Sequence, residues 1–81
     1  MVYEGMDAAR IGERIRALRE EKHETAEQLA TSLNISTSAI AMYENGNRIP
    51  RDEIKIRIAE HFAVTVESIF FPNKQHELCE G

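Results

Sequence analysis

Apolar residues recur along the chain at helical spacing, in short runs separated by turn-forming residues. In the first run, Ile11, Ile15 and Leu18 stand at positions i, i+4 and i+7, which places them on one face of a helix. Charged residues occupy most of the positions between them, as expected of a helix with one face toward solvent. No segment shows the sustained apolar–polar alternation of a half-buried strand. The pattern therefore predicts an all-helical protein.

Capping residues mark where the first three predicted helices begin and end. Asp7 is an N-cap candidate for the first helix, and Thr25 for the second, where Gln28 completes a capping box. Asn34 is suited to end the second helix because asparagine tolerates the left-handed backbone of a tight stop. Ser36 is then placed to cap the third helix, after a connection of only a few residues.

Two further helices are predicted after the turn sequence Asn45-Gly46-Asn47. Pro50 is placed to open the fourth helix, and Thr65 can cap a short fifth one. Pro72 cannot continue that fifth helix, since proline has no backbone N–H. The apolar residues of these two helices again fall at helical spacing: Ile54, Ile58, Ala59, Phe62, Val66, Ile69 and Phe70.

The length of 81 residues is enough for one small domain. We expect this domain over residues 8–71, between an N-terminal extension (1–7) and a polar C-terminal tail (72–81). A core of this size is marginal, and small chains often gain stability by dimerising.

The composition is that of a soluble globular protein, with 42% apolar and 30% charged residues. No apolar run approaches the ~20 residues that cross a bilayer, and the N-terminus lacks the basic start and apolar stretch of a signal peptide. A single cysteine, Cys79, excludes an intramolecular disulfide and is typical of a reducing compartment. These features predict a cytoplasmic protein that does not enter the membrane.

Candidate chemistry for an enzyme or a metal site is sparse. His76 and Cys79 have ligand-like spacing, but a structural zinc site needs four ligands, and His23 and His61 lie far away in the sequence. The chain has no glycine-rich phosphate loop and no recognisable nucleophile–base or paired-carboxylate motif. The sequence therefore predicts a protein that is not an enzyme and needs no metal or other cofactor.

The connection Leu33-Asn34-Ile35-Ser36 has the length of the turn in a helix-turn-helix. Around it, the chain from about Ile11 to Phe70 resembles the Cro/CI-type (phage-repressor-like) helix-turn-helix family in order and spacing. The matching segments are Ile15–Lys22, Thr25–Ala30, Leu33–Ser36, Ile40, Tyr43–Pro50, Ile58–Ala59, Val64–Val66 and Ile69–Phe70. The resemblance implies a compact five-helix, lambda-repressor-like domain that binds double-stranded DNA and regulates transcription.

The resemblance also implies roles for individual residues. Arg19 and Glu44 match an arginine and a glutamate that pair in the family, and a bidentate pair of this kind would pin two helices together. The base-reading positions of the family correspond to Ser36, Thr37, Ser38, Ala41 and Met42. Phosphate contacts are expected from Gln28, Asn45, Asn47, Arg48 and Arg51.

The sequence departs from the family pattern in two ways. Ala26 stands where the family often has a phosphate-binding glutamine. The reading helix also lacks the long polar side chains that make bidentate contacts to bases. Thr37 and Ser38 can each make one hydrogen bond, whereas Ala41 and Met42 offer only apolar contact. Sequence preference is therefore expected to depend largely on DNA shape, the loop after the reading helix and dimer spacing.

The net charge of −4 runs against the basic surface that is usual in DNA-binding proteins. The charge is uneven, however: residues 8–24 hold five basic and four acidic residues, and residues 48–60 hold four and three. A phosphate responds mainly to charges within about 8–10 Å, so the local balance matters more than the sum. We expect DNA binding with modest non-specific affinity.

The leading interpretation is a transcriptional repressor that binds a palindromic operator as a homodimer. The alternative is an adaptor or antitoxin-type regulator whose main partner is a protein, which the acidic charge and the sparse reading helix favour. The predicted dimer surface consists of Val66, Ile69, Phe70 and Phe71. Other basic residues are expected to lie on a solvated face: Arg10, Arg14, Arg16, Lys55 and Arg57.

Overall fold

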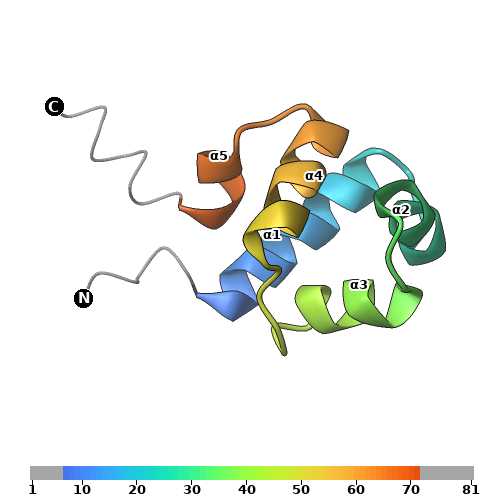
Figure 1. Ribbon diagram of the computed structural model, residues 1–81, viewed down its shortest axis with the longest axis horizontal. Coiled ribbons are helices and arrows are strands. Elements are labelled where there is room, and N and C mark those ends of the chain that lie inside the picture. The colour runs from blue at the N-terminus through green and yellow to red at the C-terminus, as the bar shows by residue number, and fades with distance from the viewer. Residues whose placement is uncertain (1–6, 72–81) are drawn as a thin grey trace, which may run out of the picture.

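The computed structural model describes residues 7–71, which form five helices and, within that range, no strand (Figure 1). The helices are α1 (Ala8–Glu21), α2 (Ala26–Leu33), α3 (Thr37–Glu44), α4 (Asp52–Phe62) and α5 (Val66–Phe70). The predicted all-helical, five-helix fold is confirmed. Within the same residues, no helix is long and apolar enough to cross a lipid bilayer.

The side chains predicted to cap the helices do so. Asp7 accepts a hydrogen bond from the Ala9 amide at 3.0 Å, and Thr25 and Gln28 form the reciprocal capping box. Ser36 and Thr65 cap α3 and α5 in the same way, each accepting at 3.1 Å from the amide three residues on. These bonds satisfy amides that a helix start otherwise leaves without partners.

The prediction that Pro50 opens the fourth helix is wrong by two residues. The helix begins at Asp52, with Arg51 in the N-cap position. Pro50 is fully buried and belongs to the connection that leads from α3 to α4. Packing of the proline ring into the core thus replaces the helix-initiating role that its fixed φ angle suggested.

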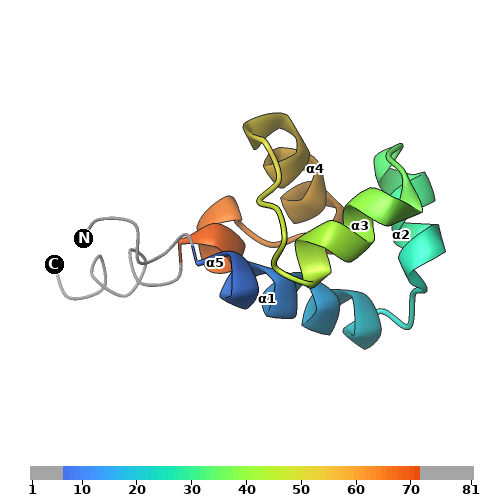
Figure 2. The ribbon, with the colours of Figure 1, turned by 90° about the horizontal axis from the view of Figure 1, so that it is seen from below.

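The apolar faces of all five helices meet in one core. In Figure 2, α1 runs along one side of the bundle, and α3 crosses it. The second helix packs against α3 and α4, while α5 joins α4 to α1. The buried apolar residues are Ile11, Ile15, Leu18, Leu29, Ala30, Leu33, Ile40, Tyr43, Ile54, Ile58, Ala59, Ile69 and Phe70.

The core includes two of the residues that were predicted to form a dimer surface. Ile69 is 1% exposed and Phe70 is 0% exposed, so neither can meet a second copy without disturbing the fold. That part of the prediction is wrong, because α5 turns these side chains toward α1 and α4. Val66 and Phe71 are only partly buried.

The expectation that Lys55 lies on a solvated face is wrong. It is buried, and its Nζ lies 3.3 Å from Asp52 Oδ1. The ammonium also lies over the rings of Phe70 and Phe71, at 5.7 and 5.8 Å from their centroids. Cation–π attraction and the ion pair compensate for the loss of hydration. Lys55 therefore ties α4 to the end of α5.

Candidate nucleic-acid interface

The second and third helices form a helix-turn-helix unit through a tight turn. Asn34 takes the left-handed conformation predicted for it, with φ of 60°, and the Ile35 amide donates back to the Ala30 carbonyl at 2.9 Å. Arg57 of α4 fastens the turn by donating from one guanidinium nitrogen to the Leu33 carbonyl at 3.1 Å. The angle between α2 and α3 is thus held both by local backbone bonds and by a distant side chain.

The third helix has one face in the core and one in solvent. Ile40 and Tyr43 are buried, and Ala39 is partly buried beside them. The predicted base-reading residues, in contrast, are all exposed: Ser36, Thr37, Ser38, Ala41 and Met42. Of these, Ser36 already uses its hydroxyl oxygen to cap the helix. We call the exposed strip formed by Thr37, Ser38, Ala41, Met42 and Asn45 the outer face of α3.

Arg19 and Glu44, which the resemblance predicted to pair, lie in bidentate contact. Arg19 Nε donates to Glu44 Oε2 at 2.7 Å, and a terminal nitrogen donates to Oε1 at 3.1 Å. The side chains are only 13% and 6% exposed. The hydrogen bond to Glu44 raises the pKa of Arg19, although burial acts in the opposite direction. The pair fixes the C-terminal end of α3 to α1.

A second set of polar contacts extends this pair to α4. The other terminal nitrogen of Arg19 donates to the Glu24 carbonyl oxygen at 2.8 Å. The Glu24 carboxylate, in turn, has both oxygens 3.0 Å from His61 Nε2, and Lys22 Nζ donates to the His61 carbonyl at 3.3 Å. The connection between α1 and α2 is therefore held to the last turn of α4. No sequence pattern indicated this contact, because Glu24 and His61 are 37 residues apart.

Gly12 lets α1 and α3 approach closely. A Cβ at this position would lie 2.5 Å from the Glu44 carbonyl oxygen and 2.8 Å from its carbonyl carbon, and it would also meet the Tyr43 oxygen. Every one of these atoms belongs to the backbone, so no rotamer change could make room. The sequence pattern gave no role for Gly12, although a glycine inside a helix costs about 1 kcal/mol relative to alanine and therefore asks for an explanation.

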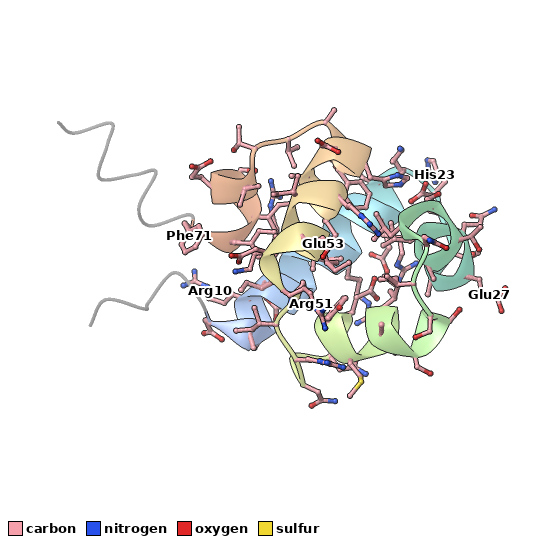
Figure 3. All side chains as sticks on the ribbon, viewed as in Figure 1. Arg10, His23, Glu27, Arg51, Glu53 and Phe71 are labelled. Atoms are coloured by element: carbon pink, nitrogen blue, oxygen red, sulfur yellow. The ribbon has the colours of Figure 1, made fainter. Side chains whose placement is uncertain are left out.

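The predicted phosphate-binding residues lie at the two ends of the helix-turn-helix. Gln28 is exposed in the first turn of α2, where its side-chain oxygen is engaged in the capping box. The others follow α3: Asn45, Asn47, Arg48 and Arg51 are all exposed. In Figure 3, Arg51 lies beside the start of α4, well away from Glu27 on α2. The outer face of α3 is thus flanked by polar groups on both sides.

Metal ligands do not gather in the part of the chain that the structure describes, where no group of three or more His, Cys, Asp or Glu residues could hold an ion. His76 and Cys79 lie outside the described residues. Among the basic residues assigned to a solvated face, Arg10, Arg14 and Arg16 are exposed as predicted. Arg57 is exposed too, but it also stabilises the turn by donating a hydrogen bond to the Leu33 carbonyl.

Residues 15–69 match the family model described as helix-turn-helix. The chain belongs to this family of DNA-binding transcriptional regulators. The resemblance to Cro/CI-type regulators is therefore confirmed.

Two relatives from Bacillus subtilis (strain 168) are similar in sequence. The HTH-type transcriptional repressor RghR is 38% identical over 61 residues, which are 74% of this chain and 45% of RghR. The chain thus spans less than half of the length of RghR. The uncharacterized HTH-type transcriptional regulator YazB is 36% identical over 69 residues, which are 85% of this chain and 100% of YazB.

Solved structures support the same fold. The restriction-modification controller protein C.AhdI from Aeromonas hydrophila superposes with a TM-score of 0.74 and 25% identity, over 79% of this chain and 97% of that one. The clp gene regulator ClgR from C. glutamicum superposes with a TM-score of 0.69, over 76% of this chain and 80% of ClgR. At 19% identity, ClgR bears on the fold alone.

Proposed function

We propose that the protein is a sequence-specific transcriptional repressor that binds a palindromic operator as a homodimer. The observation that carries this proposal is the outer face of α3, which is held in solvent while its opposite face is locked into the core. A reading helix must project in this way to enter the major groove. The similarity to RghR, named as a repressor, favours repression over activation.

Residues of α3 and of both ends of the helix-turn-helix would contact the DNA. The first turn of α3 presents the hydroxyls of Thr37 and Ser38 to base edges, and the remaining reading positions are Ser36, Ala41 and Met42. Phosphates on either side are bound by Gln28, Asn45, Asn47, Arg48 and Arg51. Two copies related by a two-fold axis would read half-sites about one helical turn, ~34 Å, apart.

Selection of bound sites from random DNA should yield an inverted repeat with this spacing. Binding should also depend only moderately on salt, since Arg48 and Arg51 are the two arginines proposed to contact phosphate in each copy. With four such contacts in a dimer, log K against log[salt] should have a slope of about −3.6. Equal affinity for all sequences would contradict the proposal, as would the absence of saturable binding to any of them.

Thr37→Ala should weaken operator binding while the melting temperature stays nearly unchanged. Thr37 is exposed at the start of α3, so its replacement removes one hydrogen-bonding group from the reading surface and none from the core. Thr31→Ala, at an exposed threonine in the second half of α2, is the matched control and should bind as the wild type does. Titration of the selected operator and thermal unfolding measure the two effects. A Thr37 variant that lost stability but kept its affinity would show that the helix faces are wrongly assigned.

The homodimer contact is proposed for the surface formed by Ile56, Val66 and Phe71. These residues line a pocket of about 360 Å³ together with Asp52 and Lys55. Ile56 is 50% exposed, the most of any large apolar side chain in residues 7–71. It replaces Ile69 and Phe70 in the predicted interface and supplies apolar area that a second copy would cover.

Ile56→Glu should convert the dimer to a monomer and leave the fold intact. A buried carboxylate in the centre of an apolar contact lacks a partner, whereas in the monomer the same side chain stays in water. Sedimentation at micromolar concentration measures the change, and circular dichroism checks the helices. Ile49→Glu, at an exposed isoleucine outside this surface, is the control and should remain dimeric. A wild-type protein that sediments as a monomer, alone and on the operator, would refute the dimer.

An adaptor or antitoxin-type regulator is the second candidate, in which α3 contacts a protein. It is favoured by the absence of Lys and Arg between Thr25 and Asn47 and by the net charge of −4. A partner whose capture is lost on Met42→Ala, and which the selected DNA cannot displace, would decide for this candidate. Competition between that partner and the operator would instead place both on the same face.

A further inference from the structure

The middle of the outer face of α3 is apolar, although both of its ends are polar. Thr37 and Ser38 present hydroxyls in the first turn, and Asn45 presents an amide at the end. Between them lie Ala41 and Met42, one turn further along the helix. Met42 is 39% exposed, which makes it one of three exposed large apolar residues in the described part of the chain, with Ile49 and Ile56.

The fold prevents this apolar strip from turning into the core. Rotation of α3 about its axis would break the bidentate contact between Glu44 and Arg19 and would expose the buried Ile40. The Asn47 amide also donates to the Met42 carbonyl at 2.9 Å, which fixes the last turn of α3 to the following loop. Ala41 and Met42 are thus held outward by the contacts that position the reading helix.

The chemistry of the major groove limits what such a strip can recognise. Base edges there present donors and acceptors, and the only apolar group is the C5 methyl of a pyrimidine. A G·C pair and an A·T pair each present three polar groups there, and either would lose water opposite Ala41 and Met42 without gaining a hydrogen bond. The G·C pair, however, offers no apolar group in return. A thymine methyl, in contrast, would bury apolar surface against apolar surface.

We propose that Ala41 and Met42 recognise the C5 methyl group of thymine, so that each operator half-site holds a thymine opposite the middle of α3. This inference rests on the proposed function, since it requires α3 to enter the major groove. The small Ala41 lets the methyl approach the helix, and the flexible thioether of Met42 closes over it. Ala41 lies about 6 Å beyond Thr37 along the helix axis. The recognised thymine therefore lies one or two base pairs from the base that Thr37 meets.

Thymine-to-uracil replacement in the selected operator tests this directly, because it removes the methyl and keeps base pairing. Each thymine is replaced in turn in a synthetic, unmethylated duplex. Wild-type affinity should fall about fourfold for each methyl lost at the contacted position, as expected for the burial of one carbon. Replacement of thymines that flank the operator serves as the control and should have no effect.

Met42→Ala should abolish most of this discrimination. The variant should bind the thymine operator more weakly than the wild type does, and the two proteins should bind the uracil operator almost equally. Its melting temperature should be unchanged, because Met42 lies outside the core. Glu13→Ala, at an exposed position of α1, is the control and should keep the full loss on uracil replacement.

The possible outcomes separate this inference from the function on which it rests. If an operator is selected and is bound equally with thymine and uracil at every position, the inference is overturned and the repressor stands. The inference is also overturned, and the repressor stands, if binding requires 5-methylcytosine and is unchanged when thymine is replaced by uracil. 5-Methylcytosine carries the same methyl group. If no operator is selected, the proposed function fails, and the thymine contact fails with it.

Discussion

Glu44→Ala is expected to lower the free energy of unfolding by about 3–5 kcal/mol, which is the range for removing one partner of a buried ion pair. The Glu44 side chain is 6% exposed and receives two hydrogen bonds from Arg19, which is itself largely buried. Without Glu44, the Arg19 guanidinium loses the contact that raises its pKa and stays charged in a place that water reaches poorly. The total free energy of unfolding of a small protein is only about 5–15 kcal/mol. The change should lower the melting temperature by roughly 12 °C or more.

Glu20→Ala is the matched control for this variant. Glu20 is also a glutamate beside an arginine, but it is exposed, and it pairs with Arg16 Nε at a distance of 4.0 Å. Exposed pairs of this kind contribute little, so the free energy of unfolding should change by less than about 0.5 kcal/mol. Urea and thermal unfolding of both variants measure the difference. Equal effects of the two replacements would mean that the contact between Arg19 and Glu44 does not fix α3 to α1.

Gly12→Ala is expected to destabilise the protein by about 3 kcal/mol, the upper end of the usual cost of overpacking. The added Cβ would lie 2.5 Å from the Glu44 carbonyl oxygen, and the neighbouring atoms are backbone, so α1 and α3 must move apart. Helix propensity alone predicts the opposite sign, since alanine is favoured over glycine by about 1 kcal/mol inside a helix. The sign of the change, measured by chemical unfolding, therefore decides between packing and propensity.

The control for Gly12→Ala is Ala17→Gly, at an exposed position of the same helix. It reports the propensity difference without any packing change and should cost about 1 kcal/mol. Because Gly12 lies against the end of α3, its replacement should also displace the outer face of that helix. We expect weaker operator binding even at temperatures where the Gly12 variant is fully folded. Binding equal to the wild type in the folded variant would show that the approach of α1 does not position the reading helix.

Local sequence was enough to predict where most of the helices begin and end. Thr25 and Gln28 satisfy one another's amides within four residues, and Asn34 ends α2 through its own backbone preference. Such features depend on atoms that are close in sequence, so they form independently of how the rest of the chain packs. The assignment of Pro50 failed for the complementary reason, since packing against distant residues, rather than its φ angle, decided its place.

The resemblance to a family supplied what local patterns could not, namely the contact between Arg19 and Glu44 across 25 positions. Neither the resemblance nor a local pattern predicted the contact between Glu24 and His61 or the burial of Lys55. The partners of these residues come from other helices. A lysine at a polar position of a helical pattern is normally solvated. The rings of Phe70 and Phe71, at the end of α5, cover this one.

The sequence by itself determined the number of helices, the capping side chains of four of them and the inward or outward side of α3, since periodicity and capping are properties of short segments. Only the tertiary structure decided which apolar residues near the end of the chain are core and which are surface. Helix α5 has five residues, and its sequence presents Val66, Ile69 and Phe70 alike as apolar. Packing against α1 and α4 buries Ile69 and Phe70 and leaves Val66 partly exposed beside Ile56. That choice depends on where the neighbouring helices lie, which no short segment encodes.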